Sequence, residues 1–159
     1  GESAFGRYPV KAVQEMNRII ETTEKSQFLP THKHLRGLAN KAEAVAESVF
    51  DLALHTGAKV IIGATDSGFT AREVAHERPY FSRLLMLTPK PKVLRQMNLI
   101  WGVEGFLTSE AESFEELIDN MMEIIKNKKL AKKGDKVVVV TGEPLGQKEN
   151  LNLVEVKTV

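Results

Sequence analysis

At 159 residues, the chain can form one domain with a full hydrophobic core and one further short element. Charged residues make up 27% of it and the formal net charge is +1, so its overall charge favours neither nucleic acid nor an anionic membrane as a partner. It has no cysteine, which excludes disulfides and thiolate chemistry, and it has neither a signal-peptide pattern nor an apolar run near the ~20 residues of a membrane-spanning helix. We therefore expect a cytoplasmic location.

The first predicted element is a helix that begins at Pro9, because proline is favoured at the first helical position. Apolar residues then recur at roughly helical spacing as far as Ile20. Pro30 and Gly37 interrupt this pattern, so residues 27–40 are predicted to form a linker or long loop. The chain does not begin with methionine, which indicates a cut inside a longer protein or the remnant of a tag.

Four further helices are predicted between residues 42 and 125. One of them follows the first strand, where Ala71, Val74 and Ala75 recur at helical spacing. Residues 42–53 have a core-facing apolar stripe that ends at Thr56-Gly57. A short helix is expected to start near Pro91. Residues 114–125 form the clearest amphipathic helix, and Ser113 with Glu116 three residues later is the signature of a capping box before it.

Five segments are predicted to be strands. They are residues 59–64, 83–88, a segment within 99–107 centred on 100–103, residues 136–140 and residues 153–159. The continuous apolar runs are typical of strands buried on both faces, whereas the last segment alternates apolar and charged residues as an edge strand does. Because the connection from Gly142 to Asn152 is too short for a crossover helix, the last strand is expected to run antiparallel to its neighbour. Strands alternating with helices predict a three-layer α/β/α fold.

The junction between the first strand and the next helix is the most informative stretch. It consists of Thr65, Asp66, Ser67, Gly68, Phe69 and Thr70. A short side-chain oxygen of Asp66 or Ser67 can cap the helix, and Gly68 allows a ligand to approach the backbone. The three hydroxyls of this stretch can converge there. A strand that runs into a capped helix start is a common geometry for binding an anion, although an ordinary strand-to-helix turn has the same pattern.

The expected strength of such a site is limited. A helix terminus contributes roughly 0.3–1 kcal/mol to an exposed anion. Millimolar affinity requires about 4 kcal/mol. The loop must therefore supply several charge-assisted hydrogen bonds or use a cation from elsewhere in the chain, and the Asp66 carboxylate opposes a dianion.

Other candidate sites have simple structural interpretations. His32 and His34 have no third metal ligand nearby in the sequence and are expected to be exposed loop residues. Trp101 is expected to be a core residue of the third strand. A basic run is expected to be a solvated helix end rather than a nucleic-acid site, because no aromatic residues lie among its lysines. The run consists of Lys126, Lys128, Lys129, Lys132 and Lys133.

The residues resemble those of a known family, the C-terminal domain of pyruvate kinase. Residues 1–9 are similar to that family's Gly-Glu-Thr-Ala-x-Gly-x-Tyr-Pro segment at the end of its catalytic barrel. The resemblance continues in order through residues 65–72, Arg78-Pro79, residues 87–91, Arg95-Gln96, residues 101–103, residues 132–135 and Asn152. Each piece alone is weak, but together they span nearly the whole chain and are specific.

The resemblance implies that residues 1–25 are the last loop and helix of the barrel, 26–38 a linker and 39–159 the C-terminal domain. It also implies a mixed five-stranded sheet with an antiparallel last strand. The catalytic residues of the family lie in the barrel, so none is expected here, and no cofactor is expected in this chain. The parent enzyme is expected to need Mg and K ions and to form a homotetramer. The implied partners are the barrel of the same polypeptide and the other subunits.

In many members of this family, a phosphorylated activator binds at the loop that matches residues 65–70. Here Phe69 stands where relatives activated by sugar bisphosphates usually have a basic residue, and Leu117 falls where they have an arginine. Residues 147–149 replace a glycine-rich turn. The resemblance therefore implies a monophosphate effector, such as a nucleotide or a hexose monophosphate, or no effector.

Three functions remain in view. The first is a regulatory and assembly domain of pyruvate kinase that is inactive alone. The second is a stand-alone α/β enzyme or binding protein for a phosphorylated metabolite, with Asp66, Glu73 or His76 as a general base and Arg72 as an anion clamp. The third is a structural dimerisation module, which predicts no phosphate binding.

Overall fold

The structure, a computed structural model, describes residues 1–24, 40–147 and 149–159. The chain divides into two compact units, Gly1–His34 and Leu35–Val159. The predicted linker at residues 26–38, together with His32 and His34, lies outside the described residues.

The first unit contains the short helix α1 (Glu2–Phe5) and the longer helix α2 (Pro9–Glu24). Pro9 is the first residue of α2, as predicted, whereas the sequence pattern did not reveal α1. A carboxylate oxygen of Glu2 accepts a hydrogen bond from the backbone N–H of Tyr8 at 2.9 Å, which ties the two helices together. None of the residues of α2 is buried. Its large apolar side chains are between 47% and 68% exposed, and these are Val10, Val13, Met16, Ile19 and Ile20.

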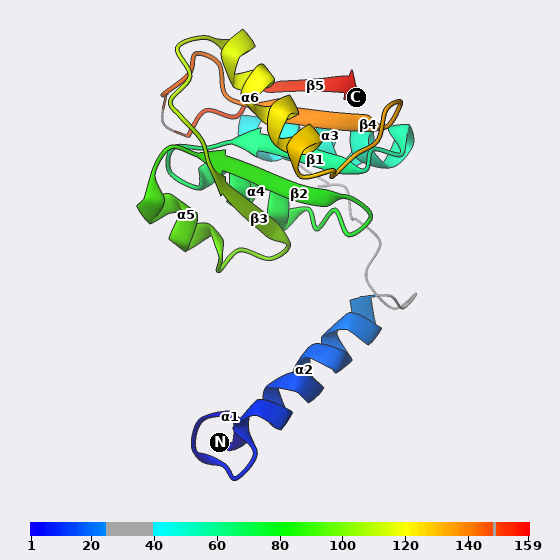
Figure 1. Cartoon of the computed structure of the whole chain (residues 1–159), viewed down its shortest axis with the longest axis vertical. Coiled ribbons are helices and arrows are strands. Elements are labelled where there is room, and N and C mark those ends of the chain that lie inside the picture. Colours follow the sequence, from blue (N-terminus) through cyan, green and yellow to red (C-terminus); the bar gives the residue numbers. More distant parts are fainter. Residues whose placement is uncertain (25–39, 148) are drawn as a thin grey trace. The chain divides into compact units, whose positions relative to one another are not determined.

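The second unit is built on one five-stranded sheet in the order β3-β2-β1-β4-β5 (Figure 1). Its strands are β1 (Val60–Ala64), β2 (Arg83–Thr88), β3 (Val103–Leu107), β4 (Lys136–Thr141) and β5 (Leu153–Thr158). Strands β1 to β4 are parallel to one another, and β5 pairs antiparallel with β4. The predicted α/β fold, with a mixed sheet and an antiparallel last strand, is confirmed.

Helices cover both faces of the sheet and complete the three layers. They are α3 (Lys41–Thr56), α4 (Phe69–His76) and α5 (Pro91–Met97) on one face and α6 (Phe114–Asn127) on the other. Successive strand residues point to opposite faces, so that Ile61 and Val138 pack against the first three helices and Ile62 and Val139 against α6. Continuous apolar runs are needed because both faces of the central strands are buried.

Local signals fix most of the helix ends. Asn40 and Glu43 form a complete capping box at the start of α3, and Gly57 ends that helix in the left-handed conformation with φ +66°. The capping box predicted before α6 is half formed, since the Ser113 side chain accepts from the N–H of Glu116. The Glu116 carboxylate instead accepts from the N–H of Glu112 at 2.7 Å.

The third strand was predicted a few residues too early. Residues 101 and 102 form a turn after α5, where Gly102 has φ +67°, and β3 begins at Val103. The interpretation of Trp101 as a core residue of a strand was therefore wrong. Its half-buried ring lies in the turn, with the Arg78 guanidinium carbon 5.3 Å from the ring centroid.

The last strand lies at the edge of the sheet, as its alternating pattern predicted. Val154 packs against the core on the α3 face. Glu155 and Lys157 form an ion pair at 2.9 Å along the other face. Val156 is 36% exposed, so this strand contributes less to the core than its pattern suggests.

Gly63 in β1 is the position where the central strands pack most closely. A Cβ atom added there would lie 2.8 Å from the backbone oxygen of Val140 and 2.9 Å from the Met86 sulfur. The absence of a side chain at this residue lets β1 lie between β2 and β4, one residue before the strand ends.

We predict that Gly63→Ala lowers the free energy of unfolding by about 1–3 kcal/mol, because the added methyl group overpacks the core against backbone atoms that cannot move away. Urea denaturation of the whole chain measures this change. The matched control is Gly1→Ala, where an added Cβ has no atom within 4 Å and stability should not change. Equal stability of the two variants would contradict the prediction.

Candidate functional site

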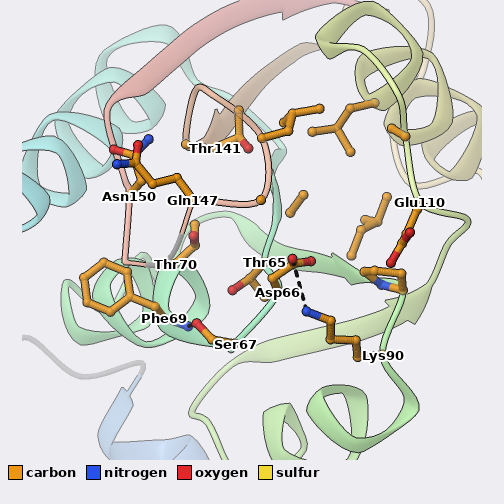
Figure 2. Close-up of a pocket in the computed structure, with 18 of the residues that line it drawn as sticks. Thr65, Asp66, Ser67, Phe69, Thr70, Lys90, Glu110, Thr141, Gln147 and Asn150 are labelled. Carbon is orange, nitrogen blue, oxygen red and sulfur yellow. Dashed lines mark hydrogen bonds and ion pairs between the residues drawn. The ribbon is translucent and has the colours of Figure 1, made fainter.

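A cavity of about 400 Å³ lies at the carboxyl ends of the parallel strands. We call it the strand-end cavity. Figure 2 shows side chains from the ends of β1, β2 and β4 and from the loop before β5 around it. In open α/β sheets, ligands bind outside the carboxyl ends of the strands, where the connections diverge. Here the chain leaves β1 into α4, whereas after β4 it turns back into β5.

The predicted anion-binding loop forms one wall of this cavity. Five of its six residues line the cavity, namely Thr65, Asp66, Ser67, Phe69 and Thr70. Gly68 is not among the lining residues. It is the N-cap residue of α4 and has φ +80°, a conformation that favours glycine.

The loop of residues 65–70 is held by a hydrogen bond that the sequence did not indicate. The buried Thr65 hydroxyl accepts a hydrogen bond from the N–H of Gly68 at 2.9 Å. The prediction that Asp66 or Ser67 caps α4 was wrong, because no side chain caps the Gly68 start of the helix. Ser67 accepts only a long bond of 3.4 Å from the N–H of Phe69, and Asp66 forms an ion pair elsewhere. The amides of Gly68 and Phe69 are thus engaged, and donor capacity at the start of α4 is left to the later amides of its first turn.

Two buried threonines line the cavity. Thr70 in α4 is 4% exposed and Thr141 at the end of β4 is 2% exposed, and Figure 2 shows both beside the cavity. Among the described residues, neither hydroxyl takes part in a hydrogen bond. Neither oxygen is fully enclosed, so both hydroxyls are available to water or to a bound molecule.

A single cation faces the cavity within the part of the chain that the structure describes. The Lys90 ammonium, which follows β2, lies 3.1 Å from a carboxylate oxygen of Asp66, and each side chain is about half exposed (Figure 2). Two more carboxylates, those of Glu110 and Glu149, belong to the described lining. The described lining of the cavity therefore contains one basic side chain, Lys90, and three acidic ones, Asp66, Glu110 and Glu149.

The remaining walls are formed by the loop after β4 and by α6. Asn150 and Asn152 both donate hydrogen bonds to the backbone oxygen of Glu143, at 2.7 Å and 2.6 Å, which closes this loop on itself. Leu117, at the position where the resemblance implies an arginine in relatives activated by bisphosphates, is 4% exposed and lines the cavity as an apolar wall.

Sequence reasoning missed Lys90, Thr141 and Asn150 as lining residues. A signal for Lys90 and Thr141 existed, because the carboxyl ends of neighbouring parallel strands meet at one edge of a sheet. No such signal existed for Asn150, whose position depends on the path of the loop after β4. Conversely, Arg72, Glu73 and His76 are not among the described lining residues.

Other candidate chemistry finds no support in the described residues. No group of three or more metal-binding side chains occurs among them. The lysines of the basic run are exposed around the end of α6, as predicted for a solvated helix end. No helix of the described segments is both long and apolar enough to cross a membrane.

Comparison with known proteins gives consistent matches along the chain. The model of the family "Pyruvate kinase, alpha/beta domain" matches residues 43–157. A pyruvate kinase of Agrobacterium vitis is 35% identical over 98% of this chain and 33% of its own length. The pyruvate kinase of Lactobacillus delbrueckii subsp. bulgaricus is 35% identical over all of this chain and 28% of its own length. The chain thus spans about a third or less of the length of these curated relatives.

We predict that Thr65→Val lowers the free energy of unfolding by about 1–3 kcal/mol, because it leaves the buried N–H of Gly68 without its acceptor while keeping the side-chain shape. Thr65→Ser, which retains the hydroxyl, is the matched control and should lose less than half as much. Chemical denaturation followed by circular dichroism measures both variants. A larger loss for serine than for valine would contradict this role of the hydroxyl.

Proposed function

Because the chain belongs to the pyruvate kinase alpha/beta domain family, we propose that it is the regulatory and oligomerisation domain of a pyruvate kinase. The span of the matches is the observation that carries this proposal. Relatives named pyruvate kinase align with nearly all of this chain, yet the chain covers about a third or less of each. The parent enzyme would transfer phosphate from phosphoenolpyruvate to ADP, with its catalytic residues and its Mg and K ions in the remaining part of the polypeptide.

The first unit supports a partnership with the catalytic barrel. Helix α2 presents a row of apolar side chains that are about half exposed or more, including Val13, Met16 and Ile20. An amphipathic helix of a globular protein normally packs its apolar face on another element. We assign that face to the barrel of the same polypeptide and assembly to contacts between identical subunits in a homotetramer.

The strand-end cavity is the proposed site of a phosphorylated effector. Its size lies within the range of small-molecule sites. The later amides in the first turn of α4, the Thr70 hydroxyl, which bonds to no described residue, and the Lys90 ammonium together supply the donors that a phosphate group needs. They are the additional donors and the cation that a helix terminus alone requires for measurable affinity.

The charges favour a monophosphate over a bisphosphate. One described basic side chain can pair with one phosphate group, and Leu117 provides an apolar wall where a second phosphate would need a cation. Thr141 and Gln147 across the cavity are suited to hydroxyl groups rather than to further negative charge. A nucleotide or hexose monophosphate satisfies both conditions.

Regulation would follow from linkage. An effector that binds one arrangement of the subunits more tightly shifts the population toward that arrangement, and the catalytic barrels change with it. The loop from residue 65 to residue 70 joins the central strand β1 to α4, so ligand contacts there act on elements embedded in the core.

We predict that glucose 6-phosphate or AMP raises the melting temperature of the chain, because a ligand that binds only the native state stabilises it by about 2.7 kcal/mol at 100 times its Kd. Lys90→Met and Thr70→Val should each weaken binding, the former by about tenfold through loss of a charge-assisted hydrogen bond. Lys92→Met is the matched control, since Lys92 belongs to α5 but does not line the cavity.

The same binding experiment distinguishes the proposed effector site from a structural module without a ligand. A purely structural dimerisation module would give no ligand-dependent change with any phosphate compound. Equal binding by Lys90→Met and Lys92→Met would place the ligand outside the strand-end cavity.

We predict that this chain alone transfers no phosphate from phosphoenolpyruvate to ADP, because we assign the catalytic groups to the barrel. A coupled assay for pyruvate with Mg and K ions present measures the reaction, and an intact pyruvate kinase is the positive control. Phosphotransfer above the uncatalysed rate would overturn the claim of inactivity.

A further inference from the structure

The cation of the strand-end cavity already has an anionic partner from the same chain. Asp66 comes from the loop after β1 and Lys90 from the loop after β2, and these neighbouring parallel strands bring their charges to 3.1 Å. Figure 2 shows the two side chains facing each other, joined by a dashed line. Lys90 is the single basic side chain of the described lining, so the pair neutralises the main attraction for an anion.

This ion pair is not needed to hold the two loops in place. Both side chains are nearly half exposed, and ion pairs of that exposure contribute little to stability. The loop after β1 is held by the Thr65 hydroxyl, and the Thr88 hydroxyl accepts from the N–H of Lys90 at 3.3 Å. The Asp66 side chain can therefore move away from Lys90 without unfolding either loop.

We propose that Asp66 is an intramolecular competitor of the effector, in that its carboxylate occupies the Lys90 ammonium and must leave before a phosphate group binds there. The proposal rests on the proposed effector site. On this proposal, Asp66 sets the affinity for the effector and the preference for ligands of a given charge. Each added negative charge on the ligand meets Asp66 and the carboxylates of Glu110 and Glu149, so ligands of low charge are favoured.

The test is a double-mutant cycle on the full 159-residue chain with glucose 6-phosphate and inorganic phosphate as probes. Isothermal titration calorimetry gives the Kd values, and melting without ligand shows that each variant folds. Asp66→Asn should lower the Kd by about threefold or more, since the amide keeps the shape but no longer neutralises Lys90. Asp119→Asn, an exposed change on α6 outside the cavity, is the charge-matched control and should leave Kd unchanged.

The second arm separates competition from simple repulsion. If Asp66 acts by occupying Lys90, the gain from Asp66→Asn should fall by at least about half in a Lys90→Met background, because only direct repulsion of the ligand then remains. An equal decrease in Kd from Asp66→Asn with Lys90 present and with Lys90→Met would overturn the proposed competition.

Failure of this inference differs from failure of the proposed effector site. Binding by the native chain with no gain in Asp66→Asn over Asp119→Asn would reject the competition and leave the effector site standing. Binding by Asp66→Asn alone would support the competition in its strongest form. No binding of either probe by any variant would reject the effector site and the competition together.

Discussion

Strand β1 is hydrogen-bonded to β2 along one edge and to β4 along the other, and both of its faces are buried under helices. The arrangement requires a strand that is apolar throughout and, at Gly63, one with no side chain between Val140 and Met86. The candidate site depends on this packing. Because three parallel strands end side by side, Asp66, Lys90 and Thr141, which are far apart in the sequence, share one cavity.

The chemistry of the site is a balance between donors and carboxylates. The start of α4, the buried Thr70 hydroxyl and the Lys90 ammonium favour an anion, whereas the acidic residues of the lining oppose one. A site with several cations would bind multiply charged phosphates tightly and with little selectivity. With one described cation, which is already paired, small changes in ligand charge carry most of the discrimination. On the function proposed above, this balance would give a regulatory site of moderate affinity.

The two units of the chain differ in how completely they bury their apolar side chains. The second unit encloses its core on both faces of the sheet, whereas α2 leaves Val13, Met16 and Ile20 about half exposed. A core-forming domain joined to an unsatisfied amphipathic helix is what is expected when an element packs on a domain outside the chain. The relatives are about three times as long or longer, which is why the barrel of the same polypeptide is the partner proposed above.

The sequence by itself determined the fold class, the antiparallel edge strand, the helix starting at Pro9 and the strand-to-helix turn at residues 65–70. Each of these has a local signal in apolar periodicity, connection length or turn chemistry. It misplaced the third strand and Trp101, since apolar residues of a turn and of a strand look alike without their neighbours. Only the tertiary structure decided that Asp66 pairs with Lys90 instead of capping α4, and that the hydroxyls of Thr70 and Thr141 bond to no described residue. These outcomes depend on strand order and register, which bring distant residues together and leave no trace in local spacing.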